Sequence, residues 1–220
     1  HNVRYDCKKF LNPKPVKFEA FSEKELQQKE EEWKKKQILK TIKFQKGICE
    51  DYSSLFKALC DEVGLEAVVV RGIARDFSNP YRNHHNNLHA WNAVKIDDEW
   101  HLLDATWGAG HINAEVTRFT RKITSGFFFT PPHLFTQNHF PEEEKWQLLD
   151  KPLTKEEFAN QTLINYTNTN FKITDFAPAG EKEADKKNKT KIWLQFENPP
   201  KAIGIATKKG KQIDFDRVDE

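Results

Sequence analysis

The sequence predicts an α+β fold in which one amphipathic helix packs on an antiparallel sheet. Apolar or partly apolar side chains recur over 52–63 with the three-to-four spacing of one helix face, and Gly64 follows where a helix C-cap belongs. A β-branched run at 65–74 and two further segments at 88–96 and 99–105 have the composition of strands. The sequence has no glycine-rich phosphate loop, which disfavours a nucleotide-binding βαβ fold.

Cys49 falls in the first turn of the helix predicted over 47–64. Unpaired backbone N–H groups and the positive end of the helix dipole meet there, and both favour a thiolate over a thiol. Taken alone, a buried and inert cysteine is the commoner interpretation of such a residue. Cys60 lies on the inner face of the same helix, and we expect it in the core.

The strands that follow supply two partners for this thiol. His89 begins the first strand of a hairpin and Asp104 ends the second, with a tight turn at 97–98. Antiparallel pairing about this turn joins residues whose numbers sum to about 195, which brings His89 within two positions of Asp104. Acyl transfer by a cysteine needs a thiolate, an imidazole and a group that orients the imidazole. If this face packs against the start of the helix, Cys49, His89 and Asp104 form such a triad, and the pKa of His89 is raised.

Three neighbouring residues are candidates for supporting roles. The backbone N–H of Cys49 is one expected oxyanion donor, and Gln45 is a candidate for the second. Trp107 is a candidate cleft wall that excludes water, with plain packing as its alternative. Trp91 is expected to face away from His89 and to lie in the core.

The flanking segments are less informative. Residues 22–46 predict an exposed helix that packs through one narrow apolar stripe, its charge run being a solvated face. Residues 127–129 predict a short strand, 139–149 are expected as packing segments, and 154–158 begin a short helix with an N-cap signature.

The change in pattern near residue 160 predicts two domains. Residues 1–160 form the domain that carries the triad, and 161–220 form a β-rich module resembling a β-sandwich. Whether the module is complete at Glu220 stays open. Its strands are expected at 171–176, 192–196, 202–207 and 212–215.

Composition excludes several classes of function. The 37% hydrophobic and 31% charged content is that of a globular protein. The net charge of +2 creates no field for nucleic acid, and no apolar run approaches the ~20 residues of a membrane span. No cofactor signature and no calcium loop occurs, so we predict no cofactor and no metal activation. The sequence does not indicate an oligomeric state.

Three motifs together resemble the transglutaminase-like superfamily, in order and in spacing. They are Gly47-Ile48-Cys49, His89-Ala90-Trp91-Asn92 and Leu103-Asp104-Ala105-Thr106-Trp107. Further segments are more narrowly similar to the kyphoscoliosis peptidase group and its bacterial relatives, namely Phe127-Phe128-Phe129-Thr130-Pro131, His139-Phe140-Pro141 and Trp146-Gln147-Leu148-Leu149.

The resemblance covers roughly residues 1–150. It implies a papain-like core with Cys49 as nucleophile, His89 as base and Asp104 as the orienting acid, acting on peptide or protein amides. It also favours an extracytoplasmic location, which the residues themselves do not indicate. Two departures are the charged insertion at 22–40 and the missing helix that normally precedes residue 2.

Two alternatives and one ambiguity remain. The first alternative is a metal site, although no paired-cysteine or His-Glu-x-x-His signature is present. The potential ligands in this region are His84, His85, His89, His101, His111 and Asp104. His84 and His85 are better interpreted as loop residues near the cleft. A non-catalytic interaction scaffold is the second alternative, because some superfamily members have lost their catalytic residues. The sequence also leaves open whether water or an amine releases the acyl group.

Overall fold

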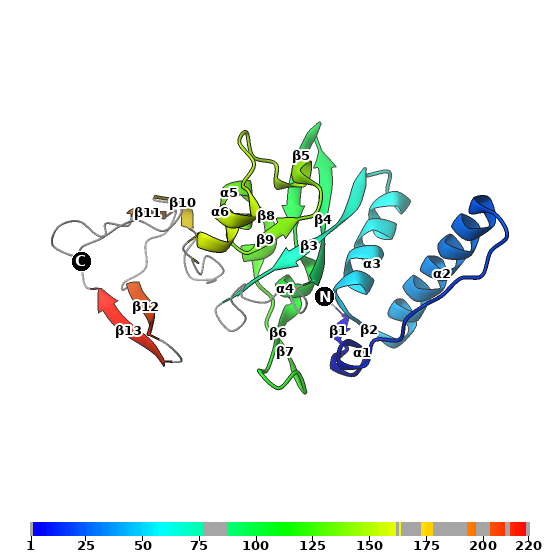
Figure 1. The fold of residues 1–220 in the computed structure, drawn as a ribbon, viewed down its shortest axis with the longest axis horizontal. Helices are drawn as coiled ribbons and strands as arrows, with labels where there is room; N and C mark the ends of the chain where they lie inside the picture. Colours follow the sequence, from blue (N-terminus) through cyan, green and yellow to red (C-terminus); the bar gives the residue numbers. More distant parts are fainter. Residues whose placement is uncertain are drawn as a thin grey trace.

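The computed structural model describes residues 2–76, 88–161 and 163, and four strands further along the chain. Its centre is a five-stranded antiparallel sheet in the order β8-β5-β4-β3-β9, and helix α3 (Cys49–Glu62) packs against it. The short helices α5 (Pro132–Phe135) and α6 (Lys155–Asn160) lie on the side away from α3 (Figure 1). The α+β prediction is confirmed. The strands are β3 (Ala67–Ala74), β4 (Leu88–Ile96), β5 (Glu99–Leu103), β8 (Phe128–Thr130) and β9 (His139–Pro141).

The hairpin of β4 and β5 has the register that the sequence predicts. Asn92 pairs with Leu103 and Ile96 with Glu99, so every pair sums to 195. Both turn residues, 97 and 98, have positive φ, at 49° and 66°, as in the mirror-image turns that match strand twist. Gly64 likewise has a φ of +76° just after α3, as expected of a left-handed cap.

Two apolar clusters fill the two faces of the sheet. On the α3 side, Cys60, Ala67, Val94 and Leu103 pack together, so the prediction for Cys60 is confirmed. On the other side lies a larger cluster of buried side chains, namely Val70, Trp91, Ala93, Leu102 and Phe135. Asn92 is fully buried between α3 and β3, donating from Nδ2 to the carbonyls of Ser53 and Val68, both at 3.0 Å.

Trp91 confirms one expectation and corrects another. Its side chain is 1% exposed, so it is a core residue. The expectation that it faces away from His89 is wrong, since residues two apart on a strand share a face. The two ring centroids are 6.2 Å apart.

The N-terminal segment wraps around the start of α3. Strand β1 (Arg4–Tyr5) pairs in parallel with β2 (Lys46–Gly47), which leads directly into α3. Helix α1 (Cys7–Leu11) adds an ion pair from Lys9 Nζ to Asp51, 2.7 Å long. Together these contacts tie residues 4–11 to the turn that presents Cys49.

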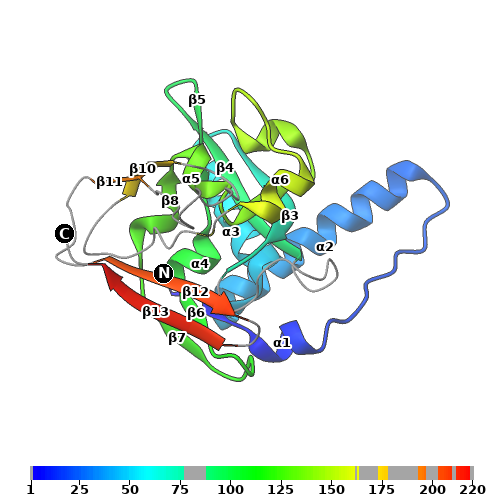
Figure 2. The ribbon, with the colours of Figure 1, turned by 60° about the vertical axis from the view of Figure 1, so that its left-hand side comes forward.

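Helix α2 (Glu23–Phe44) is exposed, as predicted, and Figures 1 and 2 both show it projecting away from the sheet. Ser22 caps it by accepting from the backbone N–H of Glu25 at 3.2 Å. Thr41 is its one buried residue, and Leu39 on the expected apolar stripe is 66% exposed. Among the residues that the structure describes, no helix has the length and apolarity to cross a membrane.

Short elements complete the first 161 residues. The strand predicted at 127–129 begins one residue later, because Phe127 ends a 3-10 turn. Helix α6 begins after the predicted N-cap, and Thr154 and Glu157 form a capping box there. The others are α4 (Ala105–Ala109), β6 (Gly110–Ile112), β7 (Phe119–Arg121), η1 (Ser125–Phe127) and η2 (Glu144–Gln147).

Four strands of the C-terminal part lie where strands were predicted, paired as two separate antiparallel ribbons. One ribbon joins β10 (Ile173–Ala177) to β11 (Trp193–Phe196), and the other joins β12 (Ile203–Lys209) to β13 (Gln212–Val218). The domain boundary near 160 and the β-sandwich arrangement stay predictions.

Candidate active site

Cys49 is the first residue of α3, as predicted, and its free thiol is half-buried. The turn before it is fixed by Asp51, which accepts from the backbone N–H of Ile48 at 2.8 Å. Gly47 is required there, because a Cβ at this position would lie 2.5 Å from the Cβ of Asp51. The local sequence thus holds the thiol at the helix N-terminus in a single backbone conformation.

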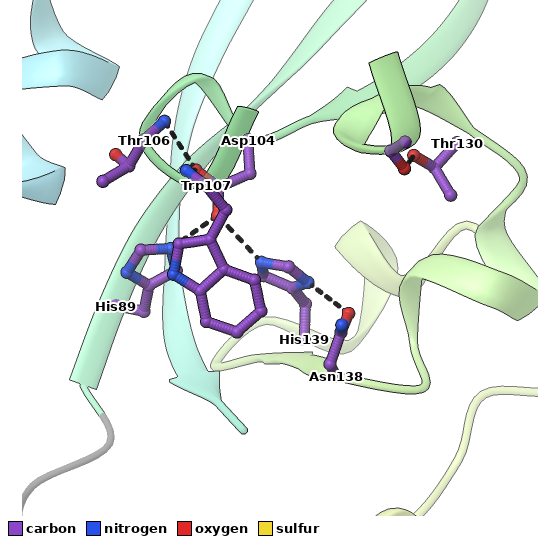
Figure 3. A network of polar contacts seen from close by, with 8 residues as sticks. His89, Asp104, Thr106, Trp107, Thr130, Asn138 and His139 are labelled. Atoms are coloured by element: carbon purple, nitrogen blue, oxygen red, sulfur yellow. Dashed lines mark hydrogen bonds and ion pairs between the residues drawn. The ribbon is translucent and has the colours of Figure 1, made fainter. Parts of the chain in front are cut away.

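His89 and Asp104 meet as the hairpin register predicts. The Nε2 atom of His89 lies 2.7 Å from Oδ2 of Asp104, and the Asp104 carboxylate is fully buried (Figure 3). Asp104 follows the end of β5 and is the N-cap of α4. Because Nε2 of His89 faces the carboxylate, Nδ1 is the ring nitrogen left for another partner.

The Asp104 carboxylate accepts four hydrogen bonds. Oδ1 accepts from the backbone N–H groups of Thr106 and Trp107 at 2.8 and 3.0 Å. Oδ2 faces two imidazoles, those of His89 at 2.7 Å and His139 at 3.1 Å. Burial by itself would raise the pKa of Asp104, but the charge of His89 and the hydrogen bonds from both rings hold it well below its usual range.

The environment of His89 favours its charged form. Burial by itself lowers the pKa of His89, but the charge of Asp104 and its hydrogen bond outweigh this effect and raise the pKa to about 10. The side chain of Cys49 contributes in the same direction, as a smaller cause. The predicted direction for His89 is confirmed. The body of α3 packs on the face of the sheet opposite to the His89 ring.

His139 was missed as a member of this group, because the sequence analysis assigned 139–149 to packing and used His139-Phe140-Pro141 only for the family resemblance. It is fully buried, and its ring stacks on Phe135 with centroids 4.0 Å apart. In the sheet register Gly72 lies opposite His89, and Ala74 lies opposite His139, all on one face of β3. Small residues at both positions leave room for the two rings, whose centroids are 5.7 Å apart. Such small residues at alternate positions of a β-branched strand are a further sequence signal for this site.

Trp107 lies against both histidines. Its ring centroid is 5.2 Å from that of His89 and 4.8 Å from that of His139, and the residue is half-buried (Figure 3). The edge-to-face contact with Phe127 supports it from behind at 5.3 Å. These contacts suit both a cleft wall and a packing residue, so the role of Trp107 stays a prediction.

Gln45 is exposed at the C-terminus of α2, in the left-handed conformation with a φ of 50°. Its carbonyl accepts from the backbone N–H of Arg4 at 2.8 Å, which fixes the backbone but not the side chain. The side chain lines an open groove of about 560 Å³. A role as oxyanion donor stays a prediction.

Tyr5 is a second residue that the sequence did not indicate. It lies opposite Gly47 in the β1–β2 pair, and Gly47 is two positions before the candidate nucleophile, Cys49. Burial first, and then the charges of Cys49 and Cys7, raise its pKa well above the usual value. Tyr5 is therefore a neutral hydroxyl near Cys49 at all physiological pH values.

The structure brings together a different set of candidate metal ligands from the one that the sequence suggested. Within the described ranges, ligand atoms of His89, Asp104 and His139 lie within 4.8 Å of one another, a spacing that suits a metal ion. Four N–H donors already account for the four acceptor positions of the carboxylate, so a hydrogen-bonded network explains the grouping. His101 instead stacks on Phe129 at 4.8 Å, and His111 is exposed. The expected loop residues 84 and 85 lie outside the described residues.

Comparison with known proteins relates this geometry to a family. Residues 14–105 match the family model described as the transglutaminase-like superfamily. The chain is 34% identical to kyphoscoliosis peptidase of Mus musculus over 162 residues, which are 73% of this chain and 22% of that protein. It is 35% identical to kyphoscoliosis peptidase of Homo sapiens over 121 residues, covering 54% of this chain and 18% of that protein. For hillarin of Drosophila melanogaster the identity is 32% over 134 residues, covering 52% and 16%.

The chain thus spans about a fifth of the length of these relatives. Its helix-on-sheet core and the matched residues agree with the resemblance that the three sequence motifs carry. The chain belongs to the transglutaminase-like superfamily and is homologous to kyphoscoliosis peptidase over part of that protein's length.

Proposed function

We propose that this protein is a cysteine-dependent acyl-transfer enzyme acting on peptide or protein amides. Cys49 is the nucleophile, His89 the general base and acid, and Asp104 the residue that orients His89. The observation that carries the proposal is the 2.7 Å contact of His89 Nε2 with Asp104, which leaves Nδ1 available to Cys49. The name of the mouse and human relatives, kyphoscoliosis peptidase, supports the same chemistry.

The steps follow from this arrangement. The Cys49 thiolate attacks the amide carbon, and the oxyanion that forms is stabilised by backbone N–H donors at the start of α3. The C–N bond breaks as the His89 imidazolium gives its Nδ1 proton to the departing amine, which leaves a thioester on Cys49. Water or a second amine then attacks the thioester. His89 takes the proton of that nucleophile and Cys49 leaves as the thiolate.

Asp104 keeps its charge throughout these steps. Its pKa lies well below the usual range, so it stays an acceptor while His89 gains and loses a proton. The imidazole therefore keeps Nε2 protonated in both states, and only Nδ1 exchanges protons with Cys49 and the substrate. Trp107, which lies against the His89 ring, limits the water that reaches the thioester.

The three free cysteines allow an internally controlled test. A fluorescent iodoacetamide at pH 6.5 should label Cys49 in preference to Cys60, whose pKa burial raises. Labelling of Cys49 should fall in His89→Ala, and peptide mapping by mass spectrometry identifies the site. Equal labelling of the cysteines, unaffected by His89→Ala, contradicts the proposed mechanism and favours a scaffold.

Turnover requires a separate measurement. A library of fluorogenic peptide amides tests hydrolysis, and a fluorescent primary amine offered with a glutamine-containing protein tests transamidation. Cys49→Ala is the control for both assays. Activity in either assay that survives Cys49→Ala refutes the assignment of the nucleophile.

A further inference from the structure

We propose that His139 is a positioning residue that acts as a neutral donor, fixing through its Nε2–H the carboxylate oxygen that orients His89. The inference rests on the proposed function and adds a fourth member to the triad. His139 does not reach the nucleophile, because both ring nitrogens are engaged, one with Asp104 and the other with Asn138.

The hydrogen bonds of Asp104 show why a fourth member is needed. Two backbone N–H groups hold Oδ1, so one end of the carboxylate is fixed by the start of α4. Among the described residues, the hydrogen bonds to the other end, Oδ2, come from the two imidazoles. Without His139, the position of Oδ2 would depend on His89, the very residue that Oδ2 is meant to orient. The hydrogen bond from His139 fixes the position of Oδ2 independently of His89.

The charges around the site favour a charged His89 and a neutral His139. His139 is completely buried, and burial together with the positive charge of His89 lowers its pKa. In the part of the chain that the structure describes, the ionisable groups facing the pair are Asp104, which contacts both rings, and Cys49, which interacts with His89. The backbone of Phe135 also hydrogen-bonds the ring and partly raises its pKa, but it carries no charge. The other close neighbours of the His139 ring are aromatic side chains, which offer a second cation no counter-ion. One buried carboxylate therefore supports one imidazolium, His89.

A neutral His139 has a defined tautomer. Its single proton must lie on Nε2, because a carboxylate oxygen only accepts hydrogen bonds. Nδ1 then carries a lone pair, 2.9 Å from the position of Asn138 Oδ1, and a half-turn of that amide exchanges its oxygen and its –NH₂ group. That amide must present its –NH₂ group to the ring in place of its oxygen. Asn138 in this way selects the tautomer that serves Asp104.

The ring is also held mechanically. Phe135 stacks on it with centroids 4.0 Å apart and an interplanar angle of 18°, and Trp91 meets it edge to face at 5.0 Å. A ring packed in this way cannot follow Oδ2 if the carboxylate turns. This rigidity makes the contact between His139 and Asp104 a fixed point for the site.

The test compares two substitutions of His139 with a matched control. His139→Gln places an amide –NH₂ near the position of Nε2, whereas His139→Leu fills the space without a donor. Thr136→Val removes another buried hydrogen bond of the same segment, 2.9 Å to the carbonyl of Pro132, and does not touch Asp104. The readouts are kcat, KM and the pH profile of kcat/KM, with thermal unfolding measured alongside.

We expect His139→Leu to lower kcat by about tenfold to a hundredfold with little change in KM, the effect of losing one hydrogen bond to a charged group. The negative charge of Asp104 is then shared with fewer donors, so it holds the His89 proton more strongly and the alkaline limb of kcat/KM moves to higher pH. His139→Gln should restore most of kcat, and Thr136→Val should leave the pH profile unchanged. Full turnover and an unmoved alkaline limb in His139→Leu would overturn the proposal.

A measurement on the unchanged protein covers the case in which His139→Leu does not fold. Imidazole ¹⁵N–¹H spectra report which ring nitrogens carry protons, and His139→Gln identifies the signals of His139. We expect a proton on Nε2 and none on Nδ1 between pH 6 and 8. A proton on Nδ1, with or without one on Nε2, overturns the inference.

These readouts also separate the inference from the proposed function. If the protein has no turnover and Cys49 reacts as an ordinary thiol, the proposed function fails, while the spectra still report on the Asp104–His139 bond. If the protein is active and His139→Leu behaves like Thr136→Val, the proposed function stands and the positioning role is wrong.

Discussion

Replacing Asp104 by Asn tests the site with the least change in shape. The two backbone donors of α4 require an acceptor at Oδ1, so the new –NH₂ group takes the place of Oδ2. It then faces Nε2 of His89 as a donor where a carboxylate accepted before. His89 must release its Nε2 proton to accept this bond, and its remaining proton moves to Nδ1. The imidazole then has the wrong tautomer to take a proton from Cys49 or from a substrate.

The structure gives the size of the effect. The pKa of His89 is raised from 6.5 to about 10, a difference of about 3.5 and so roughly 5 kcal/mol, in which Asp104 is the largest favourable contributor. Without the carboxylate, His89 loses the main charge that outweighs its burial, and we expect it to be neutral at pH 7. We expect turnover to fall by about a thousandfold to ten-thousandfold, as expected when a triad histidine has the wrong tautomer.

The assay combines turnover with thiol alkylation between pH 5 and 9. Asp104→Asn should slow Cys49 alkylation below pH 7, because the thiolate loses its imidazolium partner, and the imidazole ¹⁵N signals of His89 should show Nδ1 protonated. Asp98→Asn is the control, since it removes the same charge from a side chain that is 98% exposed. Turnover within threefold of the unchanged protein, with His89 still titrating near pH 10, would refute the reasoning.

Four further predictions concern single residues. The free energy of unfolding should fall as pH rises from 6.5 toward 10, by up to about 1.4 kcal/mol per pH unit. The reason is that the pKa of His89 is higher in the folded than in the unfolded protein, so the stabilisation present below about pH 6.5 is lost as His89 loses its proton. Urea midpoints at several pH values check this, and His89→Gln should remove the slope. Gly72→Ala should destabilise the protein by about 1–3 kcal/mol or more, because its Cβ would lie 2.1 Å from the carbonyl oxygen of Phe140; urea unfolding measures it. Gln45→Ala should lower kcat by about a hundredfold to a thousandfold with unchanged stability if the side chain is an oxyanion donor, and steady-state kinetics with thermal unfolding decide. Trp107→Ala should lower turnover per folded molecule if the ring is a cleft wall, whereas a loss of stability with full turnover identifies a packing residue.

The parts of the fold that the sequence predicts are those with a local cause. The α3 helix follows from a repeating apolar face and a capping glycine, and the hairpin register follows from the position of one two-residue turn. Because His89 and Asp104 belong to that single hairpin, their meeting requires no knowledge of the rest of the chain. The alternation of side chains along a strand is equally local, so the sequence itself places Trp91 on the same face as His89, and the expectation misapplied this rule.

His139 could not be predicted in this way, because its place depends on a contact between distant segments. It lies on a three-residue strand, 35 residues after Asp104, and reaches the site by pairing with Ala74 on the far edge of β3. A strand so short has no periodicity of its own. The exposure of Leu39 on α2 has the same origin, since a suitable stripe does not specify whether another element covers it.

Asp104 has two structural functions that use different oxygens. Oδ1 caps α4 and, through the N–H of Trp107, fixes the backbone of the residue whose ring lies on His89. Oδ2 orients His89 itself. The helix that Asp104 caps therefore begins with the residues that shield its partner, and the two N–H groups of the cap stabilise the negative charge that the imidazolium requires. Removing the carboxylate should disturb the base, the ring against it and the first turn of α4 together. For this reason Asn, which keeps the acceptor at Oδ1, is the substitution that isolates the electrostatic part of the site.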